Sequence, residues 1–226
     1  MDASLDPEVY IALAEQRDWS IGHVLDTHVH ADHLSRSRAL ADKTGAKLHL
    51  PNGDQVSFPV ELISDGDVLS VGDARLVARA TPGHTMGSMT YQLDESALMT
   101  GDTLFLEGVG RPDLEASAEE TQVRARLLYQ SLVKLSTLPD DILILPGHTS
   151  APIEFNGEPI ADSLVSVRKN FDLLQLPEEA FVHRISSHIP PAPQNHAAIV
   201  ALNAAGAEYE GEPADLEAGA NRCAFT

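Results

Sequence analysis

Four potential metal ligands lie within six residues of the sequence: His28, His30, Asp32 and His33. Imidazole nitrogens and carboxylate oxygens bind zinc and iron in proteins. Residues 21–26 directly before them predict a buried strand, whose alternation would place His28 and His30 on the same side. The loop that follows can turn Asp32 and His33 toward a neighbouring position, so this segment could hold part of two metal ions. The alternative is a surface cluster, or a helix-capping aspartate beside chance histidines. With 10 histidines in 226 residues, however, three within six are improbable by chance.

Three further candidate ligands lie where predicted strands end. His84 lies in the turn-rich segment TPGHTMGS, where small neighbours allow the backbone to approach closely. Asp102 follows a strand predicted at residues 97–100, and His148 follows an apolar strand predicted at residues 142–145. Taken singly, these are ordinary loop histidines and a turn aspartate. Together with the first segment they favour a metal centre built from strand ends, where a scaffold can hold ligands in place.

Helix and strand patterns alternate through the chain. They predict helices at residues 6–19, 34–44, 119–138, 160–174 and 195–205. They predict strands at residues 21–26, 47–50, 75–80, 89–93, 97–100 and 142–145. The chain therefore begins as a βαβ unit and continues as antiparallel sheet mixed with helices. This is typical of layered sheets covered by helices.

Composition limits the class of protein. A chain of 226 residues that is 43% hydrophobic fits one domain over residues 1–226, with a loosely held acidic tail at residues 207–226. The formal charge of −19 argues against nucleic-acid and anionic-membrane partners. A single cysteine, Cys223, excludes an intramolecular disulfide and zinc sites built from cysteine pairs. Without a long apolar run or a signal-like start, we expect a soluble cytoplasmic protein.

The HxHxDH motif, with the later histidine, aspartate and histidine in this order, resembles the metallo-β-lactamase superfamily, particularly its glyoxalase II and persulfide dioxygenase branch. The resemblance extends over residues 21–206. It implies an α+β fold, a four-layer αββα sandwich. By this resemblance the ligands of the first metal are His28, His30 and His84, those of the second are Asp32, His33 and His148, and Asp102 bridges the two.

Two chemistries fit this ligand set. In the first, two metals, usually zinc, acidify a bridging water that attacks a thioester, lactone or other activated carbonyl. Asp32 would orient the hydroxide and help the leaving group to take a proton. In the second, one Fe(II) bound by His28, His84 and Asp102 keeps positions open for a persulfide sulfur and dioxygen. The other candidate ligands would then position this set and carry protons.

Flanking segments favour the second chemistry. Residues 107–114, EGVGRPDL, resemble the GRxD segment of persulfide dioxygenases, and the proline-rich residues 189–196 are similar to the entry to their last helix. Arg111 would then bind the anionic substrate, although a structural pair with Asp113 is the alternative. Glyoxalase II is expected to hold glutathione with basic residues near its C-terminus, where this chain is acidic. We therefore predict oxidation of a low-molecular-weight thiol persulfide at one Fe(II), with two-zinc hydrolysis of a thioester or lactone as the alternative.

The start of the chain departs from the family pattern. Family members normally begin with a strand pair before the segment that resembles residues 2–19, and this chain starts almost at that helix. A sheet edge exposed in this way could be covered by a second copy, so a homodimer is an expectation. A non-catalytic metal-binding module is a further alternative, against which the intact ligand set argues. The expected partner is a small thiol-derived molecule, with neither nucleic acid nor membrane.

Overall fold

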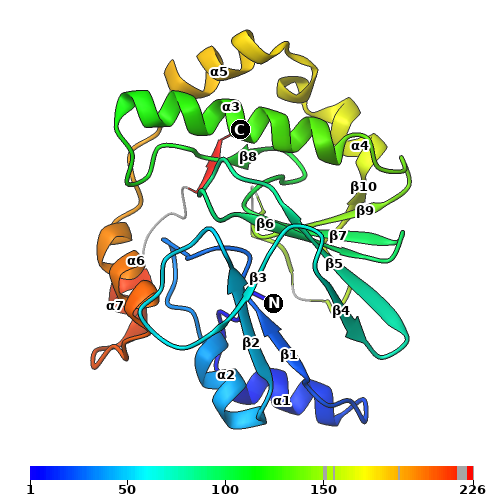
Figure 1. Ribbon diagram of the computed structural model, residues 1–226, viewed down its shortest axis with the longest axis vertical. Coiled ribbons are helices and arrows are strands. Elements are labelled where there is room, and N and C mark those ends of the chain that lie inside the picture. Colours follow the sequence, from blue (N-terminus) through cyan, green and yellow to red (C-terminus); the bar gives the residue numbers. More distant parts are fainter. Residues whose placement is uncertain (150–151, 155, 188, 218–222, 226) are drawn as a thin grey trace. The chain divides into compact units, whose positions relative to one another are not determined.

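The computed structural model describes residues 1–149, 152–154, 156–187, 189–217 and 223–225 (Figure 1). The chain divides into two compact units. The first unit consists of residues 1–63 and 193–221, and the second of residues 64–192 and 222–226. A single domain over residues 1–226 stays a prediction. None of the described helices is long and apolar enough to span a membrane.

The first unit is built on a parallel sheet whose strands, in spatial order, are β1 (His23–Leu25), β2 (Lys47–Pro51) and β3 (Glu61–Ile63). Its helices are α1 (Pro7–Glu15), α2 (Ser37–Thr44), α6 (His196–Ala205) and α7 (Pro213–Glu217). The predicted βαβ unit is confirmed, because β1 and β2 are parallel and α2 connects them. α2 ends at Gly45, whose φ of 71° is a left-handed conformation that glycine adopts without strain.

A small apolar core holds the helices of the first unit against its sheet. Val24 of β1 packs with Ala3, Leu40 and Ala41, and all four side chains are buried. The backbone N–H of Asp2 donates to the carbonyl of Leu25 at 2.8 Å, which ties the start of the chain to the end of β1. The histidine-rich segment begins directly after this anchored strand end.

The second unit contains a six-stranded sheet with the order β10-β9-β7-β6-β5-β4. Its strands are β4 (Val68–Val71), β5 (Ala74–Ala80), β6 (Met89–Leu93), β7 (Ala97–Gly101), β9 (Leu143–Pro146) and β10 (Asp162–Ser163). Strands β4 to β7 pair antiparallel, as the turn-separated pattern predicts, whereas β9 joins β7 in parallel. The parallel pairing places the ends of β7 and β9 at the same edge of the sheet, and Asp102 and His148 follow these two ends.

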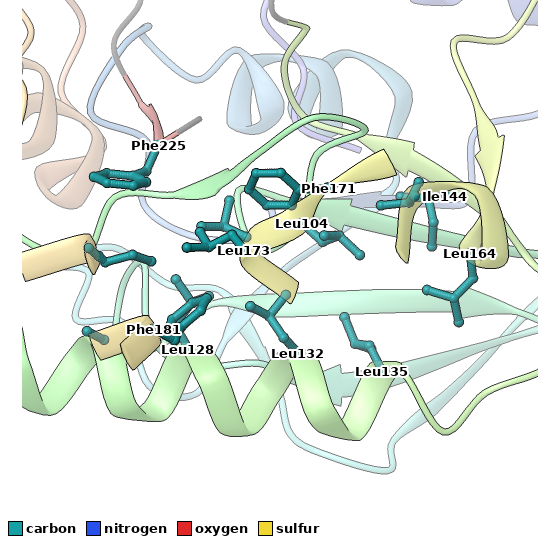
Figure 2. Packing of buried hydrophobic residues seen from close by; sticks show 14 of the residues in the cluster. Leu104, Leu128, Leu132, Leu135, Ile144, Leu164, Phe171, Leu173, Phe181 and Phe225 are labelled. Atoms are coloured by element: carbon teal, nitrogen blue, oxygen red, sulfur yellow. The ribbon is translucent and has the colours of Figure 1, made fainter. Parts of the chain in front are cut away.

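The core of the second unit lies between this sheet and helix α3 (Ala118–Leu135), as Figure 2 shows. α3 begins with a capping box in which Ser117 and Glu120 satisfy each other's backbone N–H groups. Leu128, Leu132 and Leu135, at helical spacing, pack against sheet residues such as Ile144. α5 (Glu178–Ser187) packs against α3 and adds Phe181, Val182 and Ile185 to the same core.

Two segments differ from the sequence prediction. The helix predicted at residues 160–174 is interrupted: β10 precedes α4 (Leu164–Asn170), and a 3-10 helix (Asp172–Gln175) follows. The break comes at Phe171, which is extended because its ring turns into the apolar core.

The acidic tail was predicted to be loosely held. Residues 218–222 and 226 of this tail lie outside the described residues. In the described part, α7 forms, and β11 (Ala224–Phe225) pairs antiparallel with β8 (Val109–Gly110). Cys223 and Phe225 are buried, so apolar side chains at the end of the tail attach it to the second unit despite its acidic composition.

Candidate metal centre

Asp2 holds the start of the histidine-rich segment in the first unit. Its carboxylate accepts the backbone N–H of Thr27 at 2.6 Å and the Thr27 hydroxyl at 3.1 Å. The Thr27 hydroxyl lies 2.9 Å from Nδ1 of His28, which orients that imidazole ring. His28 itself is 1% exposed. His28, the first histidine after β1, is therefore held in place through its Nδ1.

His30 is fixed in the same way but through the opposite nitrogen. Its Nε2 lies 3.1 Å from Oδ1 of Asp2, and the ring is 3% exposed. Its Nδ1 is buried and has no hydrogen-bond partner among the described residues; the nearest acid, Asp32, has Oδ1 3.9 Å away. A buried nitrogen without a partner is costly in a folded protein. It is the atom that a metal ion would use.

Asp32 and His33 continue the cluster. Nδ1 of His33 lies 3.1 Å from Oδ1 of Asp32, and Nε2 of His33 is a second buried nitrogen that lacks a hydrogen-bond partner within the described chain. His30, Asp32 and His33 each offer one ligand atom, and these atoms lie within 4.8 Å of one another. Nitrogen and carboxylate oxygen donors at this spacing fit zinc or iron(II).

Two polar side chains from elsewhere in the first unit hold the backbone of this loop. The amide of Asn203, on α6, donates to the carbonyls of His30 at 3.0 Å and His33 at 2.8 Å. Asp54, after β2, accepts the backbone N–H of Val29 at 2.7 Å. The loop is therefore fixed on both sides before any ion binds, which reduces the entropy lost on metal binding.

The Asp2–His30 pair sets the charge of the metal-free cluster. Burial disfavours charge on both groups. Their mutual attraction and hydrogen bond outweigh burial, so the pKa of Asp2 is lowered to about 2 and the pKa of His30 is raised to about 10. For the buried Asp26, burial raises the pKa above its ordinary value. A metal that binds Nδ1 of His30 must therefore displace a proton.

A second cluster lies in the second unit, where Asp102 faces two histidines. Oδ2 of Asp102 lies 3.6 Å from Nε2 of His84, and its Oδ1 lies 3.3 Å from Nε2 of His148. Asp102 and His84 are each 3% exposed. One carboxylate thus directs one oxygen toward each histidine, which is the geometry that a bridging ligand requires.

Each histidine of the second cluster is oriented by a neighbour. Nδ1 of His84 lies 2.8 Å from the carbonyl oxygen of Arg111, so this nitrogen is the protonated donor and Nε2 faces Asp102. The ring of Phe105 meets the ring of His148 edge-on at 5.7 Å. Both histidines therefore present Nε2 toward Asp102.

Two glycines let the backbone approach Asp102 closely. A Cβ atom at Gly147 would lie 2.7 Å from Oδ1 of Asp102. A Cβ at Gly110 would lie 1.8 Å from the carbonyl oxygen of Asp102 and 2.9 Å from Cβ of His84. The strand-end loops can converge on the carboxylate because these positions lack side chains.

Arg111 was predicted to bind substrate, with a structural pair to Asp113 as the alternative. The structure places its guanidinium against Asp113, with Nε 2.9 Å from Oδ1 and Nη2 2.6 Å from Oδ2. The side chain is 1% exposed. These contacts support the structural alternative, and a contact with substrate stays a prediction.

The sequence prediction missed the residues that orient the ligands. Asp2 and Asn203 are 28 and 173 positions from His30 in the chain, and neither lies in a motif. No local signal indicates them, because their role depends only on where the fold brings them. The Gly110 and Gly147 positions had a weak signal, since each lies next to a candidate site residue.

Histidines and aspartates that follow strand ends on an α+β scaffold have the ligand types and the placement of a candidate metal site. The comparison with known proteins agrees: residues 1–148 match the model of the metallo-beta-lactamase superfamily. The chain belongs to this superfamily, in the branch that contains glyoxalase II and the persulfide dioxygenases. The predicted family and the predicted α+β fold class are confirmed.

Curated relatives are named hydroxyacylglutathione hydrolase. That of Maricaulis maris is 36% identical over 146 residues, which are 63% of this chain and 54% of the relative. That of Rhodopseudomonas palustris is 31% identical over 198 residues, 85% of this chain and 71% of the relative. The chain thus spans about half the length of the first of these relatives.

Solved structures give the same fold. The structure of ETHE1 from Myxococcus xanthus is 31% identical with a TM-score of 0.77, covering 92% of this chain and 87% of that one. A metallo-beta-lactamase from Staphylococcus aureus has a TM-score of 0.83 at 27% identity, covering 92% of this chain and 65% of that one. The names of the curated relatives favour the predicted hydrolase alternative over the predicted dioxygenase.

Proposed function

We propose that the protein is a metal-dependent hydrolase that cleaves a thioester of a small thiol with two metal ions. The observation that carries the proposal is the pair of buried nitrogens, Nδ1 of His30 and Nε2 of His33, that have no hydrogen-bond partner in the described chain. A single ion at His28, His84 and Asp102 would use neither, and each unsatisfied buried group costs about 1–3 kcal/mol. Two ions would use both.

The seven predicted ligands would form this centre together. That assignment comes from the motif order of the superfamily, and the geometry within each unit supports it. In the first unit, His30 and His33 each leave one nitrogen for a metal. In the second, the two oxygens of Asp102 address two different histidines, which suits a bridging carboxylate. The relatives named hydroxyacylglutathione hydrolase support a thioester as the substrate.

Two bound zinc ions would supply a hydroxide near neutral pH and polarise the thioester carbonyl. Asp32 would orient the attacking oxygen and hold its proton until the carbon–sulfur bond breaks. The proton then passes to the departing thiolate, so the products are a carboxylate and a thiol. Asp2 keeps Nε2 of His30 protonated, and the Arg111 carbonyl keeps Nδ1 of His84 protonated, so that the opposite nitrogens stay available.

The second candidate is the predicted persulfide dioxygenase with one Fe(II). Two observations favour it: the segment Gly110-Arg111-Pro112-Asp113, and the likeness to ETHE1 across 87% of that chain. In this case His28, His84 and Asp102 bind the iron. The remaining candidate ligands would surround the iron and relay protons.

Metal analysis together with two assays separates the candidates. Protein purified without added metal is analysed for zinc and iron, then tested for hydrolysis of S-lactoylglutathione and for oxygen uptake with glutathione persulfide. About two zinc ions per chain with thioester hydrolysis support the proposal. About one iron with persulfide-dependent oxygen uptake supports the second candidate and refutes the first. Asp102→Ala is expected to abolish either activity, and a fully active variant would overturn the ligand assignment.

A further inference from the structure

Arg111 is one of the largest fully buried side chains of the described protein, although it carries a permanent charge. It directly follows β8, and its backbone N–H extends the pairing of β8 with β11 by donating to the carbonyl of Cys223 at 2.9 Å. Burying a guanidinium is costly unless its charge and its N–H groups are satisfied. The partners of this guanidinium therefore indicate what the buried charge does in the fold.

Four hydrogen bonds within the second unit hold the guanidinium. Nε and Nη2 form a bidentate pair with Asp113, whose side chain is 12% exposed. Nη2 also donates to the carbonyl of Pro190 at 2.7 Å, and Nη1 donates to the carbonyl of Pro191 at 2.9 Å. A substrate anion could reach these four N–H groups only by displacing the Asp113 carboxylate or the two carbonyls. These bonds hold the guanidinium in a fixed position, and we call this group with its partners the anchor.

The main chain of Arg111 connects this anchor to the metal ligands. Its carbonyl accepts the Nδ1–H of His84 at 2.8 Å. Directly before it, Gly110 passes so close to His84 and Asp102 that no Cβ fits there. A shift of this strand would therefore rotate the His84 ring or displace Asp102.

We propose that Arg111 and Asp113 form a buried clamp that positions His84 for metal binding, by fixing the carbonyl that holds its Nδ1–H. The inference rests on the proposed metal centre, because it assigns His84 as a ligand. It replaces the predicted substrate contact with a positioning role. The proline-rich segment at residues 190–191 belongs to the clamp, since its two carbonyls accept hydrogen bonds from the guanidinium.

The clamp and a substrate contact predict different results for conservative variants. Arg111→Lys keeps the charge but cannot form the bidentate fork, and Asp113→Asn keeps the shape but loses the charge. If Arg111 binds substrate, both variants change KM and leave metal affinity intact. If the clamp positions His84, both lower metal affinity about 10- to 100-fold, as expected when the partner of a metal-binding histidine is disturbed.

Metal affinity is measured by competition with a chromophoric chelator, using zinc and cobalt(II) on protein first stripped of metal. Leu135→Ala is the control for lost stability, because it makes a cavity in the core of the same unit and leaves the hydrogen bonds of the clamp in place. Arg126→Ala is the control for lost ion pairing, since Arg126 pairs on the surface with Glu178 and Glu179. Both controls are expected to bind zinc within about twofold of wild type.

The tautomer of His84 gives a measurement that needs no metal. Nitrogen-15 NMR of the metal-free protein, at a pH where the ring is neutral, is expected to show His84 protonated at Nδ1 in the wild type and a mixture of tautomers in Asp113→Asn. A wild-type ring protonated at Nε2, or variants that bind zinc as tightly as the controls, would overturn the clamp. Failure of the wild type to bind any metal would instead refute the proposed function, and the NMR result would still decide the clamp.

Discussion

Replacing Asp2 by Asn tests whether an acid outside the ligand motif controls the metal site. Asn keeps the size of the side chain and an oxygen that can accept the Thr27 N–H, but it removes the negative charge opposite Nε2 of His30. The lost interaction is a hydrogen bond between charged groups at 3.1 Å, in a side chain that is 20% exposed. Such bonds contribute about 1.5–3 kcal/mol, which corresponds to a loss of about 10- to 150-fold in zinc affinity after correction for the proton that His30 releases.

The assay is chelator competition over a series of pH values, which allows the zinc affinity to be corrected for the His30 proton. An NMR titration of His30 in the metal-free protein supplies the pKa for this correction. Without the acid, the raised pKa of His30 is expected to fall. Asp6→Asn is the matched control, because Asp6 is a nearby acid that caps α1 by accepting the N–H of Glu8 at 2.9 Å. An Asp2→Asn variant that binds zinc within twofold of this control would refute the reasoning, as would an unchanged His30 titration.

Three further outcomes follow from the two clusters. Because the pKa of His30 is raised from 6.5 to about 10, its pairing with Asp2 stabilises the metal-free protein below pH 6.5, and this contribution is lost as the pH rises toward 10. Without metal, thermal melts should therefore show stability that falls between pH 6.5 and 10. With zinc, stability should rise over the same range. The same trend with and without zinc would contradict the assignment of His30 as a ligand. Gly147→Ala places a methyl group 2.7 Å from Asp102 Oδ1, so calorimetry should show a loss of about 1–3 kcal/mol together with reduced metal content. His33→Ala should lower the bound metal from two ions to one per chain by elemental analysis, and retention of both ions would exclude His33 as a ligand.

The strand-end location of the ligands was predictable from sequence because it depends on local patterns. The apolar run before His28, the turn residues around His84 and the apolar strand before His148 each predict a strand that ends where a polar side chain follows. In the structure His28 follows β1, Asp102 follows β7 and His148 follows β9. The motif order carried the resemblance to the superfamily, and that resemblance implied the α+β class.

The acidic tail and the interrupted helix at residues 160–174 were less predictable. Composition describes the average polarity of a segment, whereas one or two apolar side chains decide whether it packs. Phe225 and Cys223 are buried although their surroundings in the sequence are polar and acidic. Phe171 likewise ends α4 by turning into the core, against the helical spacing of its neighbours.

The sequence by itself determined the types of metal ligand, their order and the superfamily to which the chain belongs. Only the tertiary structure decided which nitrogen of His30 and of His84 would face a metal, because the partner of the other nitrogen comes from a distant part of the chain. Asp2 performs this role for His30, and the carbonyl of Arg111 performs it for His84. The same principle applies to Arg111: its charge suggested a substrate contact, whereas its burial against Asp113 is the observation from which we propose a positioning role. A motif specifies which side chains can bind a metal, whereas the fold specifies how these side chains are oriented.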